Sequence, residues 1–177
     1  MRANFVAKRK YKVSLIEDIA ERDANYIRLL RLLPRLRRWR DFSRRPGPDF
    51  DAAASAELLA HTATFLLPGP DGGDISLRIR VTEAFRYTTS LEIVQQPGDP
   101  DRIANPAMQV RVYHDVNSAE VISYQGHRGF KARYKQPDRR MYQVNEKALI
   151  NRFLGEWLTL CLQCGRVEHH LEAMLET

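Results

Sequence analysis

The sequence lacks the motifs that identify the common catalytic mechanisms. It contains no G-x-G-x-x-G, Walker phosphate loop, H-E-x-x-H or G-x-S-x-G pattern. The sequence therefore shows none of the motifs of the common nucleotide-binding proteins, zinc proteases and serine hydrolases. No apolar run approaches the roughly 18 to 20 residues that a membrane helix needs. The opening residues, MRANFVAKRKYKVS, carry charge without an apolar stretch, which is unlike a secretory signal. We therefore expect a cytoplasmic protein with no cofactor and no membrane partner.

Cysteine is scarce, and its placement argues against a disulfide framework. Cys161 and Cys164 are the two cysteines of the chain, and their spacing on a predicted helix fits poorly with a structural disulfide. Their position at the end of that helix disfavours redox catalysis, because the helix dipole there raises a thiol pKa. Together with His169 they leave a zinc site as a weak hypothesis, since zinc needs four ligands. Two packed or idle cysteines are the alternative.

Positive charge is concentrated near the N-terminus. Residues 1–45 hold 14 Lys and Arg against 5 Asp and Glu, a net charge of +9, whereas the remainder carries −3. With 44% hydrophobic residues in 177, the chain fits one soluble domain over residues 14–177, preceded by a basic tail over 1–13 and interrupted by an arginine-rich insert over 35–50. The asymmetry suggests an anionic partner, and a solubilising arm is the alternative.

Helical spacing occurs at both ends of the chain, and strand alternation lies between them. Ser14 and Glu17 form a capping box that predicts a helix ending at Pro34. Residues 75–81, 108–112 and 130–134 alternate with period two, and Asn145 precedes a second long helix that ends before Gly165. Short turns between the strands require antiparallel pairing. The prediction is α+β, with an antiparallel sheet of about five to six strands and both helices on one face.

The apolar positions of the two predicted helices follow helical periods. In the first helix they are Ile16, Ile19, Tyr26, Ile27, Leu30 and Leu33, and in the second Leu149, Ile150, Phe153, Leu154, Trp157, Leu158 and Cys161.

Several stretches resemble one family. They are 15–33 with its Arg-Leu-Leu-Pro ending, 85–89, VRVYHDVNSAEV at 110–121, FKARY at 130–134, and 145–165. Together they are similar to the YqiB-like family of uncharacterised proteobacterial proteins, a domain of unknown function. The resemblance implies a bacterial cytoplasmic protein and supplies no catalytic residues. The chain departs from the family in its arginine-rich insert, its C-terminal extension and Cys164.

The hairpin over 108–124 predicts a carboxylate pair. If Asn117 and Ser118 form the centre of the turn, Asp115 lies opposite Glu120. Two facing carboxylates repel and need a cation, a metal or a shared proton. An arginine from a neighbouring strand is the simplest partner.

His114 follows the parity of the inward residues Val110 and Val112, so adjacent Asp115 points to the other face. A buried, hydrogen-bonded histidine is the expected state. Were His114 functional, Glu83 would have the matching parity, and the two would form a general-base pair. A small enzyme or ligand binder built on His114, Glu83, Asp115 and Glu120 is therefore the alternative function.

Basic residues define the function that we favour from sequence, a non-enzymatic module that binds an anionic partner. Nucleic acid or a nucleotide is the first candidate, because phosphates are bound by cations. A protein–protein adaptor is a further alternative. The predicted anion-binding residues are Arg35, Arg37, Arg38 and Arg40 in the insert, and Arg78, Arg80, Arg111, Lys131 and Arg133 on the outward sheet face. Arg–Glu pairs across the strands would neutralise that face.

Overall fold

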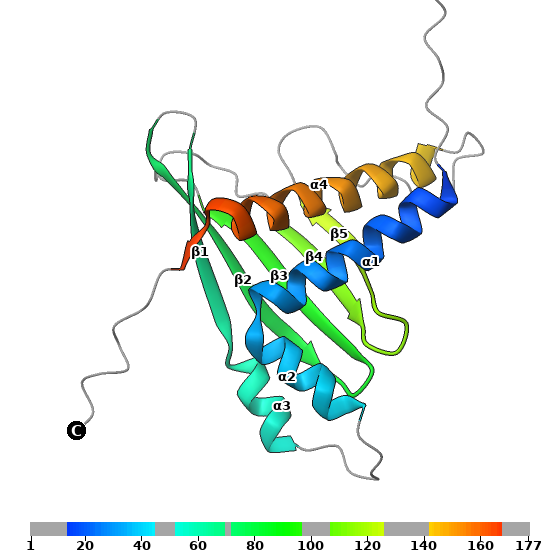
Figure 1. Ribbon diagram of the computed structural model, residues 1–177, viewed down its shortest axis with the longest axis vertical. Coiled ribbons are helices and arrows are strands. Elements are labelled where there is room, and N and C mark those ends of the chain that lie inside the picture. The colour runs from blue at the N-terminus through cyan, green and yellow to red at the C-terminus, as the bar shows by residue number, and fades with distance from the viewer. Residues whose placement is uncertain (1–13, 45–51, 70–71, 97–106, 126–141, 168–177) are drawn as a thin grey trace, which may run out of the picture.

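An antiparallel sheet carries helices on one face (Figure 1). The computed structural model describes residues 14–44, 52–69, 72–96, 107–125 and 142–167. The strands are β1 (Thr62–Pro68), β2 (Asp74–Ala84), β3 (Thr88–Gln96), β4 (Ala107–Tyr113), β5 (Ser118–Gln125) and β6 (Arg166–Val167). Their order across the sheet is β5-β4-β3-β2-β1-β6. The predicted fold class, α+β with an antiparallel sheet, is confirmed.

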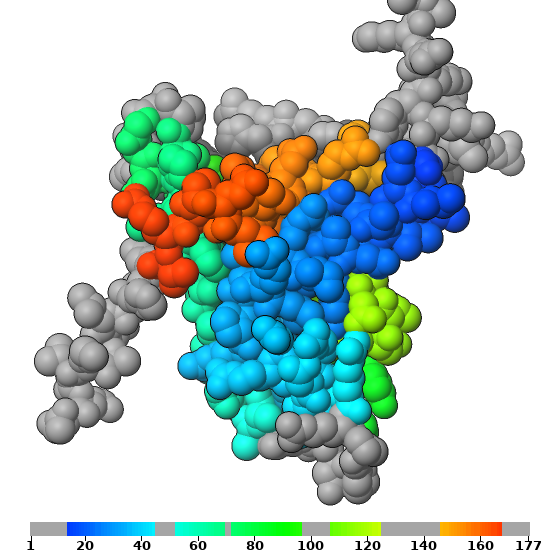
Figure 2. Space-filling view, viewed as in Figure 1, coloured from blue at the N-terminus to red at the C-terminus, as the bar shows by residue number. Residues whose placement is uncertain are grey.

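Two long helices cover the sheet, and two short helices lie at one end of it. The helices are α1 (Leu15–Leu32), α2 (Pro34–Ser43), α3 (Ala52–Leu59) and α4 (Tyr142–Cys164). Figure 1 shows α1 and α4 side by side across the strands, with α2 and α3 below them. In Figure 2 the α1, α2 and α4 side chains form a continuous layer over this face of the molecule. None of the described helices is both long and apolar enough to span a membrane.

The helix boundaries near the N-terminus follow the predicted local signals. The Ser14 side chain accepts a hydrogen bond from the Glu17 amide, and Glu17 and Asp18 stand in the first turn, where the helix dipole favours negative charge. Pro34 ends α1 and begins α2 as its first residue, a position where the missing amide costs nothing. The proline therefore divides one predicted helical segment into two helices.

The core lies between the sheet and the α1–α4 layer. Leu77, Ile79 and Val81 of β2 are buried, as are Met108, Val110 and Val112 of β4, so the predicted strand parities hold. The helix stripes need correction. Ile16, Ile19 and Ile27 are 80%, 48% and 52% exposed, and Leu149 is 53% exposed. In the first helix the three isoleucines face solvent, whereas Tyr26, Leu30 and Leu33 of the same predicted stripe are buried, as expected.

A buried polar seam joins α4 to the edge of the sheet, and sequence patterning does not predict it. Asn151 is fully buried, and its Oδ1 accepts the Val121 amide of edge strand β5 at 2.8 Å. Asn25 of α1, also fully buried, donates from Nδ2 to the Asn151 carbonyl oxygen at 2.9 Å. These bonds satisfy polar groups at a strand edge that would otherwise lie unpaired, so they fix β5 against both long helices.

The last described strand was also not predicted. After Gly165, Arg166 and Val167 pair with Leu66 and Phe65 of β1, where a polar tail or a helical turn was expected. The strand predicted over 130–134 lies outside the described residues.

Candidate functional site: an arginine surface on α2

The most strongly basic described helix is α2, and its buried face determines where its arginines point. Leu36, Trp39 and Ser43 recur at helical spacing and are buried. The arginines occupy positions between and beside these, so they face outward. We call Arg35, Arg37, Arg38, Arg40 and Arg44 the α2 arginine surface. All are exposed except Arg40, which is partly buried.

Hydrogen bonds to the β2–β3 turn and to the β4–β5 turn hold α2 in place. The Trp39 indole Nε1 donates to the Phe85 carbonyl oxygen at 3.3 Å, and Arg86 Nε donates to the Ser43 carbonyl oxygen at 3.4 Å. Arg44 donates to the His114 carbonyl oxygen at 3.2 Å and to the Asn117 side chain. Asn117 adopts a positive φ of 56°, which asparagine tolerates better than most residues. The arginine surface is therefore presented on a fixed helix.

Few carboxylates neutralise the α2 arginine surface. Arg40 pairs with Asp41 at 2.6 Å, and Arg35 lies 3.8 Å from Glu57 of α3. Within the described ranges, neither Arg37 nor Arg38 reaches a carboxylate. Burial lowers the pKa of nearby His61, and Arg35 and Arg38 lower it further. The potential around α2 is thus positive.

A small pocket separates α2 from α3. Its volume is about 150 Å³. Its lining combines Arg35, Arg38 and Glu57 with the apolar side chains of Trp39, Phe42, Ala54 and Leu58. The Trp39 and Phe42 rings pack with centroids 5.7 Å apart and planes inclined by 30°. Sequence reasoning found the arginines but missed this pocket, because the packing of α3 against α2 depends on tertiary structure.

The outward face of the sheet is also rich in arginine, but two of its three described arginines are paired with glutamates. Arg80 of β2 donates to Glu92 of β3 at 2.8 Å, and Arg111 of β4 lies 3.6 Å from Glu83. Arg78 is exposed on the same face. Lys131 and Arg133 lie outside the described residues. The described part of this face therefore has the cross-strand pairs that were weighed as the alternative to anion binding.

His114 is buried, as its parity predicts. It is 1% exposed, and its Nε2 lies 2.9 Å from the Thr89 hydroxyl. Burial lowers the pKa of His114 to about 4, with further lowering by Arg44 and Arg40. At neutral pH it is an uncharged histidine in the core beneath α2.

The proposed pairing of His114 with Glu83 is wrong. A β-bulge between Val81 and Glu83 shifts the register, so Glu83 lies opposite Ser90 on the outward face. There it accepts from the Ser90 hydroxyl at 2.5 Å and pairs with Arg111. One extra residue in the strand reverses the parity of everything after it. Sequence alternation alone gives no sign of this bulge.

The predicted facing of Asp115 and Glu120 is also wrong. The turn occupies residues 114–117 rather than centring on 117–118, so Tyr113 pairs with Ser118 and Arg111 with Glu120. Asp115 is exposed in the turn and accepts from the Val116 amide at 3.0 Å. The two carboxylates therefore form no site.

Glu120 has a different role, as the acceptor of an ion-pair network. Lys147 of α4 lies 2.9 Å from it and Arg22 of α1 lies 3.0 Å from it, while the Tyr113 hydroxyl donates at 3.2 Å. Burial by itself would raise the pKa of Glu120, but Lys147, Arg22 and Tyr113 outweigh it and lower the pKa. The network links β5 to both long helices and is structural.

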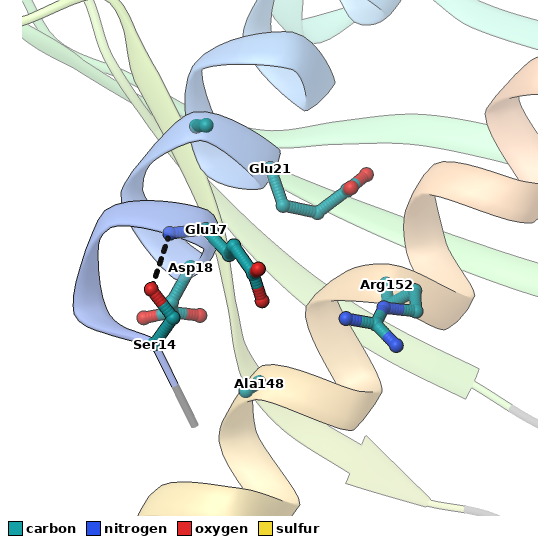
Figure 3. A pocket seen from close by; sticks show the side chains of 7 residues that line it. Ser14, Glu17, Asp18, Glu21, Ala148 and Arg152 are labelled. Atoms are coloured by element: carbon teal, nitrogen blue, oxygen red, sulfur yellow. Dashed lines mark hydrogen bonds between the residues drawn. The ribbon is translucent and has the colours of Figure 1, made fainter. Parts of the chain in front are cut away.

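A second pocket of about 300 Å³ lies between the N-terminal halves of α1 and α4 (Figure 3). In Figure 3 Glu17 of α1 and Arg152 of α4 extend into the space between the two helices. Asp18 and Glu21 also line it, and each pairs with an arginine of its own helix: Asp18 with Arg22 at 2.5 Å, Glu21 with Arg28 at 2.7 Å. Three carboxylates and one arginine line this pocket, and two of those carboxylates are paired with arginines of α1, so the pocket offers no surplus of positive charge for an anion.

The two cysteines form neither a disulfide nor part of a metal-ligand cluster among the described residues. Cys161 is buried and Cys164 is exposed, and both are free thiols. Burial, together with Cys164, raises the pKa of Cys161 to about 12, so it is fully protonated at neutral pH. No group of three potential ligands occurs among the described residues, and His169 lies outside them. The zinc hypothesis stays a prediction.

The fold and this surface define an α+β protein that presents a basic helix at one end of a sheet covered on one face. Residues 28–167 match the family described as "Protein of unknown function (DUF1249)", and the chain belongs to that family. This confirms the resemblance predicted from the sequence motifs. No solved structure matches.

Curated bacterial relatives show the same likeness. The chain is 43% identical over 88 residues to "Uncharacterized protein YqiB" of Escherichia coli strain K12, which covers 50% of this chain and 63% of that protein. The proteins of the same name from E. coli O6:H1 and O157:H7 give the same values. The match thus spans less than two thirds of the curated relatives, and neither family nor relatives carry an established activity.

Proposed function

We propose that the protein is a non-enzymatic binding module that holds single-stranded nucleic acid on the α2 arginine surface. The observation that carries this proposal is the exposure of Arg37 and Arg38 without a carboxylate partner in the described part of the chain. Unpaired guanidinium groups bind phosphate in bidentate fashion, and each contact releases condensed counterions. A fixed helix adds to this by presenting several such groups without the cost of ordering the backbone.

A single strand fits this surface better than a duplex, because an aromatic pocket adjoins the arginines. The α2–α3 pocket offers Trp39 and Phe42 beside Arg35 and Arg38. Cationic grooves flanked by aromatic side chains are typical of single-strand binding. Duplex phosphates alone would make no use of an apolar pocket. The basic tail over 1–13 adds long-range attraction, and the proposed location is the cytoplasm.

The enzyme alternative loses its geometric basis in this fold. His114 is 1% exposed and lines neither of the two pockets described above. Its intended partner Glu83 lies on the opposite face of the sheet, and Asp115 and Glu120 do not meet. A general base must reach its proton through a hydrogen bond or one water molecule. The four residues therefore support no common catalytic centre.

Fluorescence anisotropy with labelled single-stranded RNA and DNA 12-mers at 50 and 200 mM KCl tests the proposal. We expect micromolar or tighter binding at the lower salt and a steep loss at the higher salt, since the contacts are to phosphates. A duplex of the same sequence serves as the comparison and should bind more weakly. Binding weaker than millimolar at both salt concentrations would refute the proposal and favour the adaptor alternative.

A further inference from the structure

The α2–α3 pocket has an apolar floor and a charged rim. Trp39, at 3% exposure, and Leu58, also at 3%, form buried parts of the floor, and partly buried Phe42 and Ala54 complete it. Arg35 and Arg38 stand at the rim from α2, and Glu57 stands there from α3. The floor attracts a flat apolar ring, whereas the rim attracts an anion and also holds one carboxylate.

The size of the pocket limits its occupant. At about 150 Å³ it is smaller than the roughly 300 to 1,000 Å³ of pockets that enclose whole drug-sized ligands. One planar ring system fits, and the rest of the ligand must lie outside along the rim. A single base attached to a sugar-phosphate backbone has this shape.

We infer that the α2–α3 pocket takes one nucleobase of the bound strand, packed against Phe42 and Trp39, with the adjoining phosphate on Arg35 and Arg38. This inference rests on the proposed function, because the strand is the one held by the α2 arginine surface. It adds base selectivity to what would otherwise be a sequence-independent contact.

Glu57 determines which base the pocket prefers. An ionised carboxylate only accepts hydrogen bonds, so it favours a base edge that carries donors. Guanine presents a ring N–H beside an exocyclic amino group, which can reach both carboxylate oxygens, whereas uracil presents one N–H between two carbonyl acceptors. The 3.8 Å separation between Arg35 and Glu57 is a loose contact. When Arg35 moves to the phosphate, Glu57 becomes available to the base.

The test compares 12-mer oligouridylates with and without one central guanosine, by anisotropy at 50 mM KCl. We expect the guanosine strand to bind about tenfold more tightly, the order of one stacked and hydrogen-bonded base. Glu57→Gln changes a side chain that is 64% exposed, so we expect the variant to fold. It should reduce this preference to about twofold while leaving oligouridylate binding at least as tight. Ala54→Phe, which fills the pocket without changing charge, should abolish the preference.

The outcomes separate the two proposals. Equal, salt-dependent binding of both strands, unchanged by Glu57→Gln and Ala54→Phe, overturns the pocket inference and leaves the arginine surface intact. Absence of binding to either strand overturns both. Circular dichroism melting of each variant confirms that it is folded, and if Ala54→Phe is not, the result with Glu57→Gln decides.

Discussion

The α2 arginine surface and the outward face of the sheet look alike in sequence but differ in their electrostatics. On the sheet, register places Arg80 directly opposite Glu92, and Arg111 beside Glu83, so opposite charges meet across strands. On α2, neighbouring arginines share one helix, and Arg37 and Arg38 face no carboxylate among the described residues. A run of basic residues therefore indicates an anion site only where the fold leaves its charges unpaired.

The largest expected effect comes from reversing charge on α2. We expect Arg37→Glu with Arg38→Glu to weaken single-strand binding about 100-fold at 50 mM KCl and to reduce the slope of log affinity against log salt by about 2, because two phosphate contacts are lost. Both side chains are exposed, so folding should be unaffected. Salt titrations by anisotropy give both numbers.

The matched control is Arg78→Glu on the sheet face, which is also exposed. It makes one charge reversal on the other surface, against two in the α2 variant, and should weaken binding less than about threefold, whereas Arg37→Glu alone should weaken it about tenfold. If Arg78→Glu instead weakened binding as much as the α2 double variant, the sheet face would share the site, and the contrast between the two surfaces would fail.

The next effect concerns the histidine beneath α2. The pKa of His114 lies at about 4, against its ordinary value of 6.5, because burial and then Arg44 and Arg40 disfavour its charged form. The unfolded chain therefore binds more protons than the folded chain between these values, and stability falls as the pH decreases through that window. The contribution of His114 should cost about 2 kcal/mol of unfolding free energy between pH 7 and pH 5.

Urea unfolding at pH 7 and pH 5 measures the total change in unfolding free energy. Because other groups also titrate in acid, the difference between wild type and His114→Gln gives the part that is due to His114. The pH dependence of the variant should be shallower by about 2 kcal/mol. Arg44→Gln should raise the pKa of His114 in an NMR titration, which would show that the charge of α2 reaches the core. Identical pH profiles for wild type and His114→Gln would contradict this account.

A third prediction concerns the scaffold that both surfaces share. Asn151→Ala should lower the unfolding free energy by about 2 kcal/mol, because the buried Val121 amide loses its acceptor. Thr159→Ala on the same helix is the control: its hydroxyl donates to a helix carbonyl, which is already bonded within the helix. Chemical denaturation measures the unfolding free energy of both variants. If both lost the same amount, the buried polar seam would contribute no more to stability than an ordinary helix hydroxyl.

The smallest expected effect is a gain in affinity for the single strand. Removing the partners of the sheet arginines with Glu83→Gln and Glu92→Gln should make the outward face attractive to phosphate. In the Arg37→Glu, Arg38→Glu background, we expect this pair to recover about fivefold in affinity at 50 mM KCl, since it unmasks about two cations. Glu17→Gln with Glu156→Gln changes net charge equally at exposed helix positions and should recover less. If both pairs of substitutions recovered the same affinity, net charge rather than ion pairing would determine binding to the sheet face.

Several elements were predictable because their signals are local. The Ser14 cap, the break at Pro34 and the parity of β4 depend on neighbouring residues, and each was confirmed. The bulge at Val81/Glu83 and the turn over 114–117 were not predictable, because a slip of one residue leaves the sequence pattern almost unchanged but reverses which residues meet. The exposure of Ile16 and Ile27 shows the same limit for helices, since periodicity does not say which side the sheet will cover.

The sequence by itself determined the fold class, the inward position of His114 and the concentration of arginine in and around α2, because these follow from spacing and local composition. Only the tertiary structure decided which arginines are free, since pairing depends on strand register and on the approach of distant elements. It also decided that α3 lies against α2, where two apolar surfaces and a basic rim enclose the pocket. Ion pairs and pockets belong to residues far apart in the chain, and no local pattern records them.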